Sequence, residues 1–191
     1  MNKYLIKFIF AFATILGVSC ASFKANKLPL VQESDFKSTK TEKIKVFSRW
    51  KYETTGADGA AWAAAHKSWF DKSILDSGCC ELVEGPKEAT LVVDGTAIDH
   101  NSPWLIIPII INGASLTVIP FWQSITVDIK VSATKGNKTS TYALKDSFTY
   151  VSWLPMIFVY PFTGGATKNK EELFYNTYLN LVVQLKRDGH L

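Results

Sequence analysis

The chain has few of the side chains on which most enzyme chemistry depends. Its 191 residues include only three histidines and three cysteines. The sequence contains no G-x-S-x-G motif, no glycine-rich phosphate-binding loop and no set of residues with metal-ligand spacing. The formal net charge of +4 is too small for a nucleic-acid-binding surface. We therefore expect a non-enzymatic protein with no catalytic residue, no cofactor, no bound metal and no nucleic-acid partner.

Charge is missing altogether from two long stretches. No Asp, Glu, Lys or Arg lies between Asp99 and Asp128, and none occurs from Ser147 to Thr167. The first stretch contains P-W-L-I-I-P-I-I-I-N-G-A-S-L-T-V-I-P-F-W over residues 103–122, and the second contains V-S-W-L-P-M-I-F-V-Y-P-F over residues 151–162. Removing apolar surface from water is favourable by roughly 25 cal/mol per Å². The environment that these two segments enter is therefore the main functional question.

Residues 103–122 are long enough for a transmembrane helix, but Pro108 and the Asn112-Gly113 pair interrupt both halves. Asn-Gly between β-branched runs predicts a β-hairpin instead. A lone hairpin cannot cross the hydrocarbon core, because its edges leave amide groups unpaired. Three interpretations remain: an exposed tip that faces a membrane or a partner, an internal core, and an oligomer contact or pore lining.

We favour the exposed tip. The residues that we expect to face a membrane or a partner are apolar side chains of the two uncharged stretches: Trp104, Ile106, Ile107, Ile109, Ile110, Ile111, Trp122, Trp153, Met156 and Phe158.

The N-terminus has the pattern of an export signal. Lys3 and Lys7 precede an apolar run over residues 8–18, which is too short to span a bilayer. The run ends in L-G-V-S-C at Cys20. This ending resembles the lipobox of bacterial envelope lipoproteins, which signal peptidase II cleaves in front of a cysteine that is then acylated. The resemblance implies a signal peptide over 1–19 and lipidation of Cys20.

Several acyl chains give stable membrane anchoring, since each buried CH₂ contributes about 0.8 kcal/mol. Ala21 stands where an aspartate would imply retention in the inner membrane, so the resemblance implies lipid anchoring in the cell envelope at the outer membrane. Residues 20–41 are rich in Lys, Ser and Thr, and we expect them to form a mostly irregular, lipidated tether. Residues 42–191 are then one folded domain.

Periodicity defines the elements of that domain. Alternation of apolar and polar residues predicts strands over 42–52, 89–99, 124–133 and 139–150, with a short strand over 79–83. Helical spacing predicts a helix after an Asp58 cap that ends at Gly78. A second helix is predicted from an Asn169 cap to Gly189, with an apolar stripe at Phe174, Tyr178, Leu181, Val182 and Leu185.

The expected fold class is α+β, with a largely antiparallel sheet of about four strands, two amphipathic helices on one face and an apolar hairpin or loop tip. If the last three strands form an antiparallel meander, the connections after Asp99 and after Tyr150 leave the same end of the sheet. The two uncharged stretches are therefore predicted to be neighbours.

The cysteines and histidines leave alternatives open. Cys79 and Cys80 are small buried apolar side chains, a strained vicinal disulfide, or residues with a redox role, and the first interpretation is favoured. His66 fits a helix face better than a catalytic or metal site. Asp99-His100 lacks an evident nucleophile, and His190 is expected in a frayed tail. Gly164-Gly165 is a weak candidate for an anion-binding site, and a flexible connection before the last helix explains it better.

The body of the chain resembles small outer-membrane lipoproteins of Gram-negative-type bacteria. The matching features are L-D-S-G over 75–78, the strand that opens over 89–95, and the proline-punctuated apolar segment before a strand pair. The order of elements is also similar to the LptE-like lipoprotein that plugs the lipopolysaccharide-export barrel. These resemblances imply a structural or assembly role, with partners that comprise the membrane, reached through the lipid anchor, and an envelope protein complex. The alternative is a periplasmic module that binds lipid or a small hydrophobe.

Overall fold

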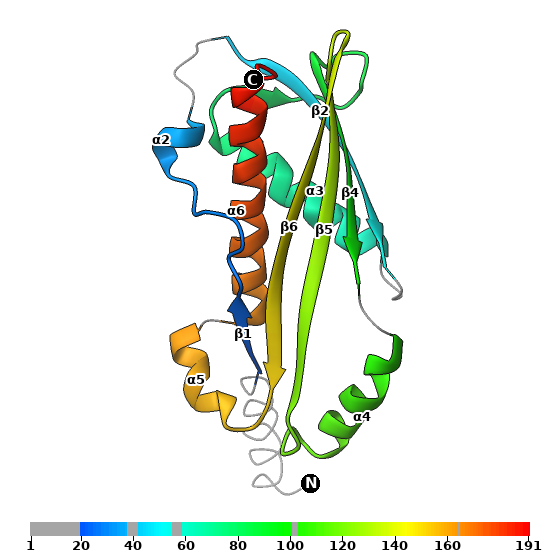
Figure 1. Ribbon diagram of the computed structural model, residues 1–191, viewed down its shortest axis with the longest axis vertical. Helices are drawn as coiled ribbons and strands as arrows, with labels where there is room; N and C mark the ends of the chain where they lie inside the picture. The colour runs from blue at the N-terminus through cyan, green and yellow to red at the C-terminus, as the bar shows by residue number, and fades with distance from the viewer. Residues whose placement is uncertain (1–19, 38–41, 55–58, 101–102, 164) are drawn as a thin grey trace, which may run out of the picture. The chain divides into compact units, whose positions relative to one another are not determined.

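The computed structural model describes residues 20–37, 42–54, 59–100, 103–163 and 165–191. The predicted signal peptide over 1–19 and the predicted Asp58 cap lie outside these residues. In chain order the elements are β1 (Cys20–Lys24), α2 (Glu33–Phe36), β2 (Ile44–Glu53), α3 (Gly59–Asp76), β3 (Cys80–Leu82), β4 (Leu91–Asp99), η1 (Pro103–Leu105), α4 (Ile106–Ala114), β5 (Phe121–Lys135), β6 (Lys138–Ser152), α5 (Met156–Thr163) and α6 (Ala166–Arg187) (Figure 1).

The fold is α+β, as the sequence predicts, but the sheet differs in detail. It has six strands in the order β1-β6-β5-β4-β2-β3. The pairs β1–β6 and β4–β5 are antiparallel, whereas β2 pairs in parallel with both β3 and β4. The prediction of about four largely antiparallel strands with two helices is therefore wrong in these respects. A helix between β2 and the strands that follow it allows parallel pairing, which alternation within single strands does not reveal.

The described residues fall into two compact units. Unit 1 takes its residues from within Met1–Ala25, Ser102–Ile125 and Phe148–Lys170, and unit 2 from within Asn26–Asn101, Thr126–Ser147 and Glu171–Leu191. Unit 1 therefore contains β1, α4 and α5, whereas unit 2 contains β2, α3, β3, β4 and most of α6. Strands β5 and β6 supply residues to both units.

The core of unit 2 forms where α3 and α6 meet β2. Trp50 of β2 packs against Phe70 of α3 at 5.4 Å and against Tyr178 of α6 at 4.9 Å between ring centroids. The side chain of Ser48 donates a hydrogen bond to Asp71 of α3 at 2.7 Å. The face of β2 that carries Ser48 and Trp50 thus packs against the two helices. Gly95 of β4 leaves the space that the Trp50 ring fills.

Helix α6 confirms the predicted apolar stripe, since all of its members are buried. The helix begins three residues before the predicted cap, so Asn169 lies inside it. The Asn169 side chain is nonetheless occupied in closing unit 1, because its Nδ2 donates to the main-chain oxygens of Ser22 at 2.8 Å and Thr163 at 2.6 Å. Gly189 follows α6 with a φ of 77°, a left-handed value that suits glycine after a helix.

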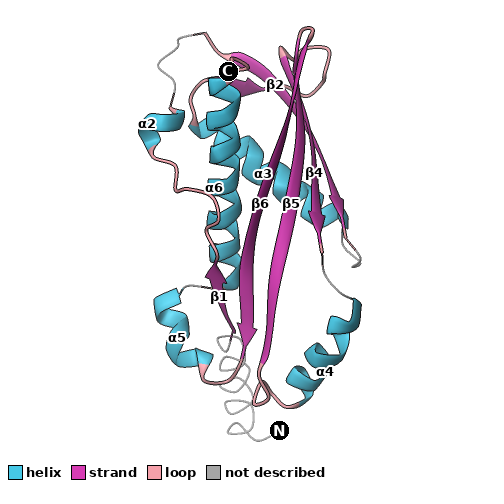
Figure 2. Cartoon of the chain, in the orientation of Figure 1, coloured by secondary structure: helices cyan, strands magenta, loops and turns pink. Residues whose placement is uncertain are grey.

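The segment over 20–41 is only partly irregular. Residues Cys20–Lys24 form β1, an edge strand that pairs with β6 in the register Cys20↔Ser152 to Lys24↔Phe148 (Figure 2). Ala21 and Ser22 are fully buried. Further along, Phe36 of α2 is buried in unit 2. The expected loose tether is therefore wrong for β1, because long-range pairing gives this polar segment an ordered place that its own sequence does not indicate.

Candidate functional site

The first uncharged stretch folds as a helix, and the predicted β-hairpin is wrong. Helix α4 follows the single turn η1 and starts at Ile106. Pro108 is the third residue of α4, where a backbone N–H would have no acceptor inside the helix, so proline is tolerated there. The Asn112-Gly113 pair lies in the last turn of α4 and connects no strands.

Asn112 fastens α4 to the rest of unit 1. Its Nδ2 donates to the main-chain oxygen of Ile119 at 2.6 Å and to that of Ser152 at 3.0 Å. Its Oδ1 accepts a hydrogen bond from the Ser152 hydroxyl at 2.8 Å. Asn112 is only 7% exposed and is the buried residue of an otherwise apolar helix. A polar side chain that is sequestered and fully used in this way defines the face of α4 that turns inward.

The backbone after α4 is also held in a defined conformation. Leu116 and Thr117 have φ values of 53° and 63°, in the left-handed region that a β-branched residue such as threonine rarely adopts. The Thr117 N–H donates to the Asn112 oxygen at 2.9 Å, and the Thr117 oxygen accepts from the Leu154 N–H at 2.9 Å. The second bond joins the two uncharged stretches directly, which confirms the prediction that they are neighbours.

The second stretch continues from β6 into α5, an eight-residue helix with Pro161 inside it. Figure 1 shows α4 leading into the start of β5 and α5 leaving from the end of β6. Phe158 is 78% exposed and Phe162 is 88% exposed. Such exposure of two phenylalanines on one short helix is costly in water, at roughly 25 cal/mol per Å² of apolar surface.

The predicted membrane- or partner-facing residues are exposed, except for Met156, which is half-buried. Their role stays a prediction. Further exposed residues of the same two stretches were not singled out from the sequence, although the absence of nearby charge marks them equally. We call the whole set the apolar surface, and its members are Trp104, Ile106, Ile107, Ile109, Ile110, Ile111, Leu116, Val118, Ile119, Trp122, Trp153, Leu154, Phe158 and Phe162.

Cys20, the predicted lipidation residue, lies in the same unit as the apolar surface. It is the first residue of β1, and β1 packs against α5. The Tyr150 hydroxyl donates to Cys20 Sγ at 2.8 Å, and Ser152 Oγ lies 3.7 Å from the same sulfur. Burial, together with the contact to Cys20, raises the pKa of Tyr150 to about 12. Ser152 thus contacts both Cys20 and Asn112 of α4.

The histidines lie in unit 2 and do not assemble a catalytic site. His66 is fully buried among aromatic rings, and its Nδ1 is 2.6 Å from the Tyr178 hydroxyl. His100 Nε2 contacts Asp128 at 2.7 Å, whereas Asp99 accepts a hydrogen bond from Tyr52 at 2.9 Å. Asp99 and His100 therefore have separate partners.

The prediction that His190 lies in a frayed tail is wrong. Its side chain is fully buried, and its Nε2 lies 2.9 Å from the Ser140 hydroxyl of β6. The main-chain oxygen of His190 accepts a hydrogen bond from Lys135 of β5 at 3.1 Å. The C-terminus is therefore fastened to the β5–β6 hairpin.

Cys79 and Cys80 form a vicinal disulfide at the junction of α3 and β3. Both residues are buried, and Ser77 Oγ lies 2.9 Å from Cys79 Sγ. Of the alternatives that the sequence leaves open, the structure shows the vicinal disulfide, and both of its cysteines are buried.

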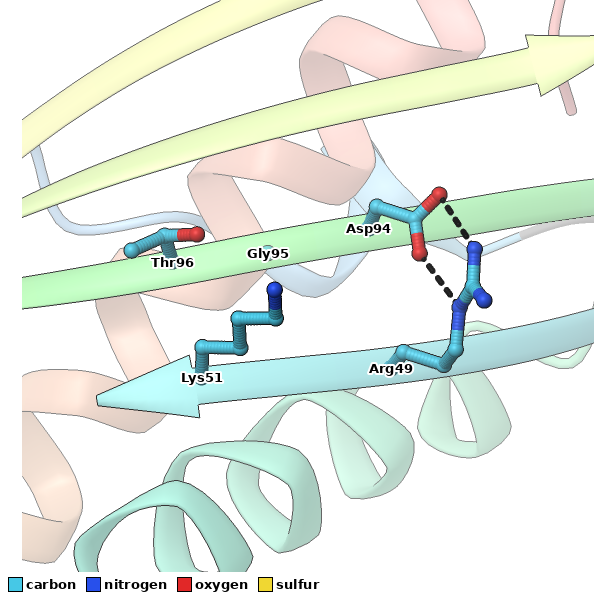
Figure 3. A pocket seen from close by; sticks show the side chains of 5 residues that line it. All are labelled: Arg49, Lys51, Asp94, Gly95 and Thr96. Carbon is cyan, nitrogen blue, oxygen red and sulfur yellow. Dashed lines mark hydrogen bonds and ion pairs between the residues drawn. The ribbon is translucent and has the colours of Figure 1, made fainter. Parts of the chain in front are cut away.

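A hollow of about 280 Å³ lies on the sheet face of unit 2 that points away from α3 and α6 (Figure 3). Arg49 of β2 makes two hydrogen bonds to the Asp94 carboxylate of β4, at 2.7 and 3.0 Å. Lys51 and Thr96 border this pair. Because Arg49 and Asp94 are exposed and form an ion pair with each other, this hollow fits a solvated sheet face better than a reaction site.

Among the described residues no group of three or more His, Cys, Asp or Glu is arranged to hold a metal ion. Within the same residues no helix combines the length and the apolar character needed to cross a bilayer.

No protein-family model matches the chain, and no curated protein sequence is similar to it. The solved structures that are similar in backbone include two PelC structures. One is the dodecamer of a PelC variant from Paraburkholderia phytofirmans, with 10% identity and a TM-score of 0.41, covering 86% of this chain and 98% of the other. The second is the PelC dodecamer from the same organism, with 9% identity and a TM-score of 0.39, covering 84% and 96% respectively. At these values neither likeness carries an argument about this chain.

Proposed function

We propose that this chain is a non-enzymatic lipoprotein of the cell envelope, lipid-anchored at the outer membrane through Cys20. Its apolar surface, from residues 103–122 and 151–162, docks on a membrane or on an envelope protein complex, and its role is structural or assists assembly. The observation that carries this proposal is the exposure of α4 and α5. Exposed large apolar side chains that gather on one folded unit mark an interaction site.

Three features support the anchored form. The sequence ahead of Cys20 has a basic start, an apolar run and the L-G-V-S-C ending. Cys20 is a half-exposed residue at the start of an edge strand, where its sulfur is close to the surface. Tyr150 and Ser152 contact that sulfur, and both belong to the same unit as the apolar surface.

The alternative of a lipid- or hydrophobe-binding pocket has weaker support. Ligand pockets bury most of their ligand within a concave, largely apolar lining. The side chains that would line such a pocket here are instead exposed, with Ile110 61% exposed on α4. Docking of the surface as a whole accounts better for that exposure.

The proposal is tested in a Gram-negative host by expressing the full chain and a Cys20→Ala variant. Mass spectrometry of the N-terminal peptide is expected to find acylated Cys20 as the first residue, and the protein is expected in the outer-membrane fraction. Photocrosslinking from residue 110 in the intact membrane then identifies what the surface contacts. An unmodified Cys20 together with a protein that stays in the soluble fraction would overturn the proposal.

A further inference from the structure

We infer that α4 and α5 lie in the headgroup region of the same membrane leaflet that holds the acyl chains of Cys20, with Ile110 the most deeply inserted residue of α4. This inference rests on the proposed lipidation of Cys20. It names one occupant of the apolar surface, a phospholipid bilayer, and it gives that surface an orientation.

No spacer separates the proposed lipid anchor from the folded residues of unit 1. Cys20 is itself paired with Ser152 in the sheet, so a lipid on its sulfur starts directly at unit 1. A lipoprotein with a long disordered tether can stand away from the membrane, whereas this arrangement keeps unit 1 at the bilayer surface. Whatever unit 1 exposes near Cys20 is therefore presented to lipid.

Unit 1 exposes apolar helices close to Cys20. Ser152 contacts Cys20 on one side and the Asn112 side chain of α4 on the other. Helix α5 packs against β1. Both helices are thus built around the residues that hold the anchor, and no Asp, Glu, Lys or Arg occurs in 100–127 or 147–167 to oppose insertion.

Helix α4 turns its isoleucines away from unit 1. At about 100° per residue, Ile110 and Asn112 project about 200° apart, on opposite faces of the helix. The exposed isoleucines at 106, 107, 109, 110 and 111 cover an arc of about 200° that is centred on Ile110. Asn112 is bonded to β6, so Ile110 points directly away from the protein.

The length of α4 determines how it can lie. Its nine residues make it about 14 Å long at about 1.5 Å per residue, less than half of the roughly 30 Å hydrocarbon core. A short apolar helix that cannot cross the core lies along the interface instead. Trp104 before α4 and Trp122 after it are both exposed, and indole rings favour the headgroup level.

The test uses the chain without its signal segment and with Cys20→Ser, so that only the apolar surface can bind. Flotation is measured with vesicles of phosphatidylethanolamine and phosphatidylglycerol. The unlipidated chain is expected to float, and Ile110→Asp is expected to reduce the bound fraction about tenfold or more, because a carboxylate is costly among acyl chains. Phe158→Asp, at a residue that is 78% exposed, should have the same direction of effect.

Leu75→Asp is the matched control. Leu75 is 50% exposed on α3 of unit 2, so it resembles Ile110 in side-chain type and exposure but lies outside the apolar surface. Flotation should be unaffected by this change. Circular dichroism of each variant checks that the helices remain folded.

Absence of flotation, or equal flotation of the folded Ile110→Asp and wild-type chains, would overturn the inference. Either result would leave the proposed function standing if Cys20 is acylated and residue 110 crosslinks to an envelope protein in the intact membrane. Lack of acylation with flotation preserved would instead contradict the anchor while keeping the lipid-binding surface. The two failures are therefore distinguishable.

Discussion

The Asn112 side chain donates a hydrogen bond of 3.0 Å to the main-chain oxygen of Ser152, and the Ser152 hydroxyl returns one of 2.8 Å to Asn112. This reciprocal pair joins α4 to the strand residue that also contacts Cys20. It fixes which face of α4 turns inward and therefore which isoleucines are exposed. The orientation of the apolar surface depends on one buried amide.

Replacing that amide should release α4. Asn112→Ala removes three hydrogen bonds and leaves the Ile119 and Ser152 oxygens without these donors, which costs about 1–3 kcal/mol for each buried group left unsatisfied. We expect faster amide hydrogen exchange throughout α4, with exchange in α6 unchanged. Asn137→Ala, in the exposed turn between β5 and β6, is the matched control and should leave α4 as protected as in the wild type. Unaltered exchange in Asn112→Ala would mean that α4 is held by other contacts.

Gly95 provides a test of the unit 2 core. A Cβ at this position would overlap the Trp50 ring, whereas a Cβ at Gly113 would meet no atom within 4 Å. Gly95→Ala is therefore expected to destabilise the protein by about 1–3 kcal/mol through overpacking. Gly113→Ala, in the last turn of α4, should be neutral or slightly stabilising. Urea denaturation of both variants measures the difference, and equal stability would contradict the packing of Trp50.

His190 makes stability depend on pH. Burial lowers the pKa of its imidazole below the usual value of 6.5, and Lys138 and Lys135 add to the shift against the opposing effect of Asp188. Between the lowered pKa and 6.5 the unfolded chain binds more protons than the folded chain, so stability decreases as the pH falls below 6.5.

Urea midpoints measured from about pH 7.5 down to about pH 5 should show this loss. The His190→Asn variant is expected to have a flatter profile than the wild type. A His190→Asn profile parallel to that of the wild type would exclude His190 as its source.

The state of the three cysteines determines how many free thiols the mature protein has. With Cys20 acylated and Cys79 joined to Cys80, the mature protein should bind no maleimide in denaturant. After reduction, only Cys79 and Cys80 should be labelled. Labelling of these two cysteines without reduction would show that the disulfide is not formed in the isolated protein.

Much of unit 2 can be predicted from local pattern. The buried stripe of α6, the alternation of β2 and the left-handed glycine at Gly136 between β5 and β6 each follow from a repeat or a turn residue. Burial in α6 and β2 repeats at the period of a helix or a strand, so the local sequence is enough to predict these two elements. The parallel pairing of β2 with β4 lies beyond such patterns, because it depends on residues far apart in the chain.

Unit 1 is harder to predict for a different physical reason. Helix α4 is apolar nearly all round, so it has no periodicity, and β-branched residues beside Asn112-Gly113 favour a hairpin locally. The hydrogen bonds of Asn112 to β6 and the position of Pro108 in the first turn favour the helix. Likewise β1 has no apolar alternation, and its pairing with β6 is set by long-range contacts. The absence of charge still identifies the residues of the apolar surface, although the local sequence predicts a hairpin where the structure has a helix.

The most direct test of the account is the depth of residue 110 in the membrane. A spin label is attached to Ile110→Cys in the acylated protein reconstituted in vesicles, with Leu75→Cys as the reference. We predict that the label at 110 is accessible to oxygen and shielded from a water-soluble nickel complex, while the label at 75 is open to nickel. Equal access of the nickel complex to both labels would contradict insertion of the apolar surface.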